Sequence, residues 1–163
     1  MGMHKLVLED TIRYDFDIIA LHCSLEAYQI AFLLNKHLNL RLHRAQEDLS
    51  VSFKKICAYF PMYHYEDKQQ CLFYDLISNR NRSKSLDTLN DNGGLFGTAV
   101  TAELNMRLLP ELKKVDFLLK VSEDGCAFAK ANTLAILNKI PQIVTAYAVD
   151  IDQLKTKENL IFE

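Results

Sequence analysis

Two carboxylates, Glu111 and Asp116, are the residues of this chain whose types and spacing come closest to a chemical site. They lie in a segment from Leu109 to Phe117 that reads L-P-E-L-K-K-V-D-F. Two converging carboxylates could act as acid and base, or could bind a divalent metal through their oxygens. The sequence places no third ligand, histidine or nucleophile beside them. We therefore predict no catalytic residue, no metal site and no cofactor.

The same segment has a structural interpretation, which the sequence favours. Pro110 fits the first position of a helical turn, where its missing N–H costs nothing. Glu111 would then be stabilised by the positive end of the helix dipole. Asp116 would lie one residue into a strand and would point to the opposite face from Val115 and Phe117. On this interpretation the segment turns a connection into a core strand.

The segment also resembles a known family signature. Its pattern L-P-E-x-x-x-V-D-F is similar to I-P-E-x-x-x-V-D-Y, which names a family of uncharacterised bacterial proteins. The matching positions are Leu109, Pro110, Glu111, Val115, Asp116 and Phe117. Leu109 stands for isoleucine and Phe117 for tyrosine, so both departures keep an apolar residue. The chain length and layout are similar as well. The resemblance implies a bacterial family, and it implies no particular reaction.

Basic residues suggest a different function, the binding of RNA or of a partner. They gather in two places, with Arg41 and Arg44 in one and Arg80, Arg82 and Lys84 in the other. Together they would form a positive patch flanked by tyrosines, on which single-stranded bases could stack. The formal net charge of -2 argues against a general nucleic-acid binder, which needs an excess of lysine and arginine. A solvated face is the preferred interpretation.

The composition predicts a single domain over 1–163 in the cytoplasm. Of the 163 residues, 49% are hydrophobic and 25% are charged, which suits one soluble domain with a core. The sequence shows neither a signal-peptide pattern nor a run of about 20 apolar residues, so it predicts neither secretion nor a membrane span. The cysteines lie far apart without metal-ligand spacing, and we expect reduced, mostly buried thiols: Cys23, Cys57, Cys71 and Cys126.

A strand–helix–strand unit is predicted over about 14–45. Phe16 to His22 is an apolar run typical of a buried strand. Ser24 offers a cap for the helix that follows, because its hydroxyl can accept from an exposed backbone N–H. Leu40 to Arg44 then alternates apolar and polar residues, which predicts a strand with one wet face.

A second unit over about 113–150 repeats this order. Val115 to Val121 predicts a strand, and Ile143 to Val149, rich in β-branched residues, predicts the returning strand. The helix between them should end before Pro141. Its predicted sheet-facing residues are Phe128, Ala131, Leu134, Ala135 and Leu137. Both helices carry Leu-Asn-Lys near their ends, at 34–36 and at 137–139.

Two such units predict an α+β fold with a ferredoxin-like split β-α-β pair on one mostly antiparallel sheet. Both helices would then cover one face. Residues 46–112 would form inserted strands with a β-hairpin, and a stretch rich in Asn, Ser and Gly predicts a mobile loop over 81–94. Residues 151–163 are predicted to form a tail with one short helix.

Three functions follow from these patterns. We prefer a non-catalytic module that binds a protein partner or a second copy of itself as a homodimer, because no catalytic constellation is complete. One alternative is a small hydrolase-like or metal-assisted enzyme using Glu111 and Asp116. The other is an RNA-associated accessory factor using the basic patch. No membrane partner is expected.

Overall fold

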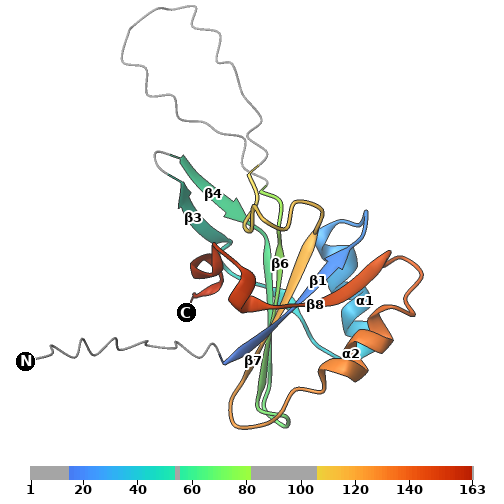
Figure 1. The fold of residues 1–163 in the computed structure, drawn as a ribbon. Coiled ribbons are helices and arrows are strands. Elements are labelled where there is room, and N and C mark those ends of the chain that lie inside the picture. Colours follow the sequence, from blue (N-terminus) through green and yellow to red (C-terminus); the bar gives the residue numbers. More distant parts are fainter. Residues whose placement is uncertain (1–14, 54–55, 82–105, 163) are drawn as a thin grey trace, which may run out of the picture.

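The computed structural model describes residues 15–53, 56–81 and 106–162. They form an α+β fold in which a six-stranded sheet carries two α-helices on one face (Figure 1). In chain order the elements are β1 (Phe16–His22), α1 (Ala27–Leu38), β2 (His43–Arg44), β3 (Leu49–Phe53), β4 (Ile56–Phe60), β5 (Met62–Asp67), β6 (Leu72–Ser78), β7 (Phe117–Glu123), α2 (Lys130–Leu137), β8 (Thr145–Val149) and the 3-10 helices η1 (Ile151–Gln153) and η2 (Lys157–Leu160).

The main sheet has the strand order β2-β5-β6-β7-β1-β8, and every neighbouring pair is antiparallel. Among the described residues, strands β3 and β4 pair only with each other, as a separate hairpin. The predicted α+β class and the mostly antiparallel sheet are therefore confirmed. The two predicted core strands lie side by side, with Ile19 of β1 opposite Leu119 of β7.

The sheet separates two apolar layers, because side chains alternate between its faces along each strand. Ile19 and Leu21 of β1 point towards α1 and α2, whereas Ile18 and Ala20 point to the other face. On that second face the cover comes from the β3–β4 hairpin, the segment 106–116 and the C-terminal 3-10 helices. Both faces are buried, which explains why β1 and β7 read as nearly continuous apolar runs.

The repeated Leu-Asn-Lys tripeptides have the same structural role in both units. Asn35 donates from Nδ2 to the Leu42 carbonyl at 3.0 Å, and its Oδ1 accepts from the Leu42 N–H at 2.7 Å. Asn138 makes the matching pair of bonds with Ala146, at 2.9 and 2.8 Å. In each unit, one side-chain amide makes the pair of backbone hydrogen bonds that a neighbouring strand would make, and it links the end of the helix to the returning chain.

The two strands of the first strand–helix–strand unit lie farther apart in the sheet than the sequence predicts. Leu40 to Arg44 was expected as one strand, but only His43–Arg44 forms β2, at the sheet edge. Strands β5, β6 and β7 lie between β1 and β2, whereas only β1 lies between β7 and β8. Asn39 ends α1 in a left-handed conformation, with φ of 55°, and Leu40 and Leu42 are buried in the helix-side core instead of joining the ladder.

The predicted cap of α1 is wrong. The N-cap is Glu26, and Ser24 lies two residues before it, exposed. The Glu26 N–H donates to Oε1 of Gln29 at 2.9 Å, and the Glu26 side chain accepts from the Gln29 N–H in return. This reciprocal capping box satisfies two helix-end donors, which a lone serine could not do.

The predicted face of α2 is partly wrong. Ala131 and Ala135 are exposed, whereas Thr133 and Leu137 are buried against the sheet. Threonine can be buried here because its hydroxyl donates to the Ala129 carbonyl at 3.2 Å, within the helix itself.

Three other predictions have mixed outcomes. The predicted single C-terminal helix is replaced by η1 and η2. Of the cysteines, only Cys23 is buried, because Cys57 lies on the outer hairpin and Cys71 and Cys126 lie in turns. The predicted mobile loop over 81–94 lies outside the described residues, apart from Asn81. Within the described ranges, no helix is long and apolar enough to cross a membrane.

Candidate functional site

The segment singled out by the sequence forms two successive turns that lead into β7. The Leu112 N–H donates to the Leu109 carbonyl at 3.0 Å, and the Val115 N–H donates to the Leu112 carbonyl at 3.1 Å. Pro110 occupies the second position of the first turn, where its fixed φ is favourable and no N–H is required. The predicted helical turn, with Glu111 at a helix N-terminus, is wrong, because neither turn continues into a helix. Leu109 and Val115 are buried and anchor the turns, and β7 begins at Phe117, two residues later than predicted.

Asn79, which follows β6 directly, organises these turns. Its Nδ2 donates to the carbonyls of Leu112 and Val115, each at 3.0 Å, and its Oδ1 accepts from the Leu109 N–H at 2.9 Å. Its own N–H donates to the Asp116 carbonyl at 2.9 Å. The residue is 0% exposed. A single buried amide therefore holds the whole segment against the end of β6.

The sequence did not single out Asn79. It stands in the polar stretch 78–85, next to the predicted loop over 81–94. The available signal was its position directly after an apolar strand, where a side chain can still be buried.

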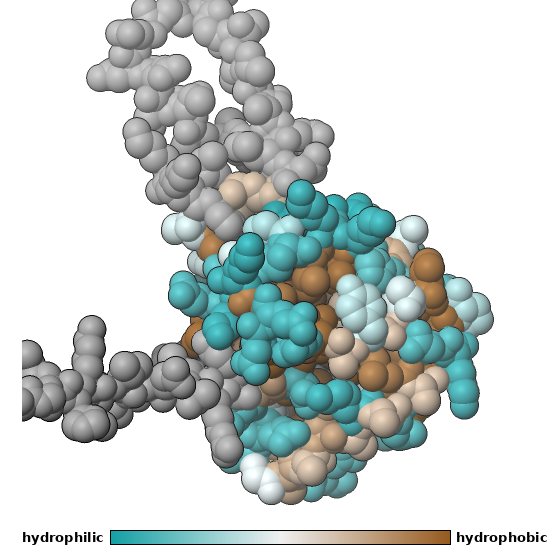
Figure 2. Space-filling view, viewed as in Figure 1, coloured by the Kyte–Doolittle hydropathy of each residue, from teal (hydrophilic) through white to brown (hydrophobic). Residues whose placement is uncertain are grey.

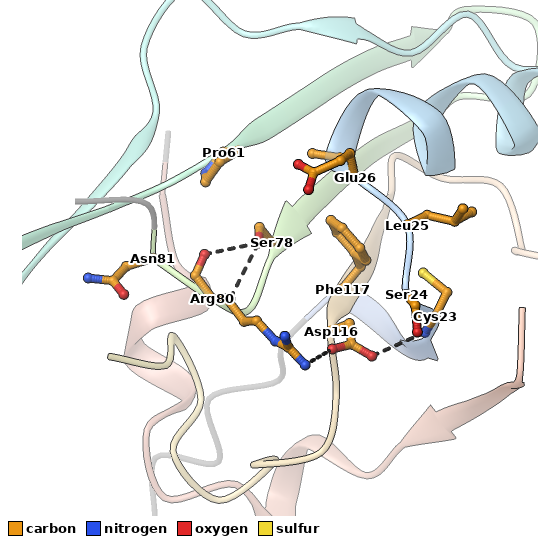
Figure 3. A pocket seen from close by; sticks show the side chains of 11 residues that line it. Cys23, Ser24, Leu25, Glu26, Pro61, Ser78, Arg80, Asn81, Asp116 and Phe117 are labelled. Carbon is orange, nitrogen blue, oxygen red and sulfur yellow. Dashed lines mark hydrogen bonds and ion pairs between the residues drawn. The ribbon is translucent and has the colours of Figure 1, made fainter. Parts of the chain in front are cut away.

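Asp116 joins the ends of three strands (Figure 3). Its Oδ2 accepts from the Cys23 N–H at 3.1 Å, and its Oδ1 pairs with the guanidinium of Arg80. Its backbone N–H donates to the Leu21 carbonyl at 3.0 Å, extending the β1–β7 ladder. The Arg80 side chain is 63% exposed, so solvent screens this ion pair. Among the described residues, Asp116 is the acceptor for the Cys23 N–H, so this hydrogen bond depends on its carboxylate.

Glu111 bonds to a different part of the molecule. Its Oε1 accepts from the backbone N–H groups of Lys155 and Thr156, both at 2.9 Å, and the Thr156 hydroxyl also donates to it. Partial burial raises the pKa of Glu111, but these hydrogen bonds outweigh it, and the net pKa lies below the ordinary value. Glu111 therefore fixes the C-terminal segment, and its carboxylate and that of Asp116 have separate partners.

A pocket of about 390 Å³ opens beside Asp116, at the N-terminal end of α1. The Asp116 carboxylate and the Arg80 guanidinium that line it are bound to each other. Burial raises the pKa of the Cys23 thiol, which disfavours a reactive thiolate. His22 precedes Cys23 and points to the opposite face of the sheet from it. There its ring stacks on Tyr147, with ring centroids 5.7 Å apart. No activated nucleophile faces this pocket within the described part of the chain.

The predicted basic patch is divided between two ion pairs. Arg44 pairs with Asp48 and donates to the Met62 carbonyl at 3.2 Å. Arg80 pairs with Asp116, at the end of β6. Arg41 is exposed, and the remaining two positions, Arg82 and Lys84, lie outside the described residues.

A second group of polar residues crosses the face of the sheet opposite the two α-helices. Register places His43 of β2 opposite His64 of β5, His64 opposite Asp75 of β6, and Asp75 opposite Lys120 of β7. We call these four residues the Lys120 row. Lys120 stood alone in an apolar run of the sequence, and strand register, which single sequences do not reveal, is what brings the row together.

Lys120 and Asp75 are buried, with only 6% and 7% of their surfaces exposed. Asp75 accepts from Nδ1 of His64 at 2.6 Å. The Lys120 ammonium lies 3.9 Å from the ring centroid of Phe162 and 4.9 Å from that of Phe16. Burial lowers the pKa of Lys120, and the negative charge of Asp75 partly opposes this. Among the described residues, no oxygen or nitrogen accepts a hydrogen bond from this ammonium.

The Lys120 row lines a hollow of about 800 Å³. The residues around it are His43, Arg44, Ala45, Gln46, Met62, His64, Phe73, Asp75, Lys120, Ser122 and Phe162. Within the described ranges, no cluster of three or more His, Cys, Asp or Glu side chains could hold a metal ion.

Comparisons of the chain with protein-family models, with curated proteins and with solved structures find no match.

Proposed function

We propose that this protein is a non-catalytic cytoplasmic module that forms a homodimer through the exposed face of α1. The proposal keeps the resemblance to the bacterial family carried by Leu109 to Phe117. It also keeps a ferredoxin-like plan for the core, which the order β8-β1-β7-β6 under two helices supports. Strands β5 and β2 would then extend that plan at one edge.

The observation that carries the proposal is an apolar surface on α1. Tyr28 and Phe32, one helical turn apart, are 62% and 65% exposed. They line a groove of about 540 Å³ together with Leu25, Leu33 and polar neighbours. Val144, on the nearby approach to β8, is 80% exposed, and Figure 2 shows hydrophobic residues at the surface where the chain enters β8. Clustered exposed apolar residues are typical of protein–protein contacts.

A second copy of the chain suits this surface because α1 is complementary to itself. Phe32 lies near the middle of α1, and Tyr28 lies one turn before it. When two copies of α1 pack antiparallel about a two-fold axis near Phe32, the exposed rings of Tyr28 and Phe32 in each copy pack against those of the other. A two-fold contact uses the same patch twice, so one apolar stripe is sufficient.

An enzyme built on Glu111 and Asp116 has less support. Each carboxylate is engaged by its own set of donors, from residues 155–156 in one case and from Cys23 and Arg80 in the other. A carboxylate that shares a site with another has a raised pKa, whereas that of Glu111 is lowered.

Light scattering coupled to size exclusion, over a wide concentration range, tests the proposal. We expect the dimer mass for the parent and the monomer mass for Phe32→Glu, which should stay folded because Phe32 is already exposed. Tyr59→Glu is the matched control, because Tyr59 is 49% exposed on the outer hairpin. A parent that remains monomeric at every concentration, or a dimer that Phe32→Glu leaves intact, would refute the proposal.

A further inference from the structure

We propose that the hollow along the Lys120 row binds a small organic oxyanion, a carboxylate or a phosphate ester, that carries a flat apolar group. This hollow shares no lining residue with the groove on α1, and it lies on the opposite face of the sheet from α1. The proposal therefore stands independently of the homodimer.

The position of the Lys120 ammonium is the first argument. A lysine this deeply buried is rare unless it is paired. The rings of Phe16 and Phe162 attract its charge but accept no ordinary hydrogen bond. Its N–H donors therefore have no oxygen partner within the described residues. A ligand oxyanion in the hollow would supply the missing acceptors, and charge-assisted bonds of this kind are among the strongest in proteins.

The charges that face the hollow are the second argument. Lys120 and Arg44 contribute positive charges, and Asp75 contributes the negative one. Asp48, the partner of Arg44, does not line this hollow. Asp75 is itself held by His64, whose Nδ1 must carry the proton if the carboxylate is ionised. Because Arg44 is already paired with Asp48 and Asp75 with His64, Lys120 is the lining charge without a bonded acceptor among the described residues, and its sign selects an anion.

The walls of the hollow are the third argument. Phe73, Phe162 and Met62 provide apolar surface beside the charged groups. The Phe73 ring stacks with the imidazole of His64, with an interplanar angle of 24°. Small-molecule sites typically measure about 300–1,000 Å³ and combine apolar walls with a few polar groups. The hollow, at about 800 Å³, is in that range. Its walls suit a ligand with an aromatic or similarly flat body.

Chemical-shift mapping on the 15N-labelled full-length protein tests the site. The probes are phenyl phosphate, benzoate and, as a neutral control of the same shape, benzamide. We expect at least one anionic probe to shift the amides of His64, Asp75, Lys120 and Ser122 in a saturable way, and benzamide to leave them unshifted. The two anions together distinguish a phosphate ester from a carboxylate as the preferred group.

Lys120→Met keeps the length of the side chain and removes its charge. We expect it to weaken the preferred anion by about tenfold or more, the size of one lost charge-assisted hydrogen bond. Lys139→Met, at an exposed position after α2, should leave the affinity unchanged. A thermal melt confirms that each variant is folded.

Three results would overturn the inference. The first is that neither anion shifts these amides at millimolar concentration. The second is that benzamide shifts them as strongly, and the third is that folded Lys120→Met retains the affinity of the parent. The map on the parent protein decides the question even if Lys120→Met does not fold. Phe32→Glu should bind the anion like the parent, so failure of the homodimer and failure of this site are distinguishable.

Discussion

Two buried polar groups of this protein differ in how completely their hydrogen bonds are satisfied. Around the turns before β7, Asn79 uses both side-chain N–H groups and its carbonyl oxygen, and Asp116 accepts from two partners. In the Lys120 row, the ammonium of Lys120 lies between two rings with no acceptor in the described part of the chain. The first group joins strands, whereas the second leaves donors facing a hollow.

This difference separates stability from function. A buried polar group that is fully bonded contributes modestly to folding but is costly to remove, because its partners lose their bonds. A buried charge without hydrogen bonds lowers stability, and such groups are retained mostly where a ligand or a reaction needs them. Mutations in the two groups should therefore change stability in opposite directions.

The largest effect is expected for Asn79→Ala. The change leaves the Leu109 N–H without its acceptor, in a site that is 0% exposed, and removes one of the two hydrogen bonds to each of the Leu112 and Val115 carbonyls. We expect the free energy of unfolding to fall by about 3 kcal/mol, since the orphaned N–H costs roughly 1–3 kcal/mol and each of the two other lost hydrogen bonds costs about 1 kcal/mol. Urea unfolding measures it, with Asn132→Ala at an exposed position of α2 as the control. A loss below that of the control would show that Asn79 does not organise the turns.

The next effect is expected for Asp116→Ala. The Cys23 N–H loses its acceptor, and the exposed Arg80 loses a screened partner. We expect a loss of about 1–3 kcal/mol, mainly from the orphaned N–H. Asp124→Ala, at an exposed turn after β7, is the matched control. A higher melting temperature for Asp116→Ala would instead indicate a strained carboxylate, as an active site would have.

The sequence predicted the parts of this molecule that depend on local patterns. The apolar runs at β1 and β7 and the helices α1 and α2 are each encoded within about ten neighbouring residues. Glu111 and Asp116 stand out in the sequence because they lie in one short segment. Their partners were not predictable, because Thr156 and Cys23 lie 45 and 93 positions away along the chain.

The Lys120 row shows the same limit more strongly. Its four members come from four strands, and only the register of the sheet aligns them. A shift of one residue in β6 would turn Asp75 to the helix side and separate His64 from Lys120. Single-sequence patterns specify which residues form a strand far better than they specify its neighbours.

The opposite sign is expected for Lys120→Met. An apolar side chain of similar length fits between the two rings, and the buried ammonium no longer has to be desolvated. We expect stability at neutral pH to rise by about 1 kcal/mol, because replacing buried charges by packed apolar groups is often neutral or stabilising. Urea unfolding of parent and variant, side by side, gives the sign. A clear loss of stability would make Lys120 a structural residue and remove the contrast between the two groups.

The advantage of Lys120→Met should also depend on pH. The folded pKa of Lys120 is lowered from its ordinary value of 10.5, so between these two values the unfolded chain binds more protons than the folded one. The stability of the parent therefore rises with pH across that window, and the advantage of Lys120→Met should shrink there. A difference that stays constant as the pH rises towards 10.5 would contradict the lowered pKa.

The smallest effect is expected for Glu111→Gln. The amide still accepts one bond from residues 155–156, but it loses the charge that strengthens the bonds from Lys155 and Thr156. Glu111 is exposed, so we expect a loss below about 1 kcal/mol at neutral pH. Because its folded pKa lies below the ordinary value of 4.5, the stabilisation is complete above that value and is lost as the pH falls through the folded pKa. Parent and variant should therefore become equally stable in acid, as thermal melts between neutral and acidic pH would show. If the difference persists at low pH, its cause is not the charge of Glu111.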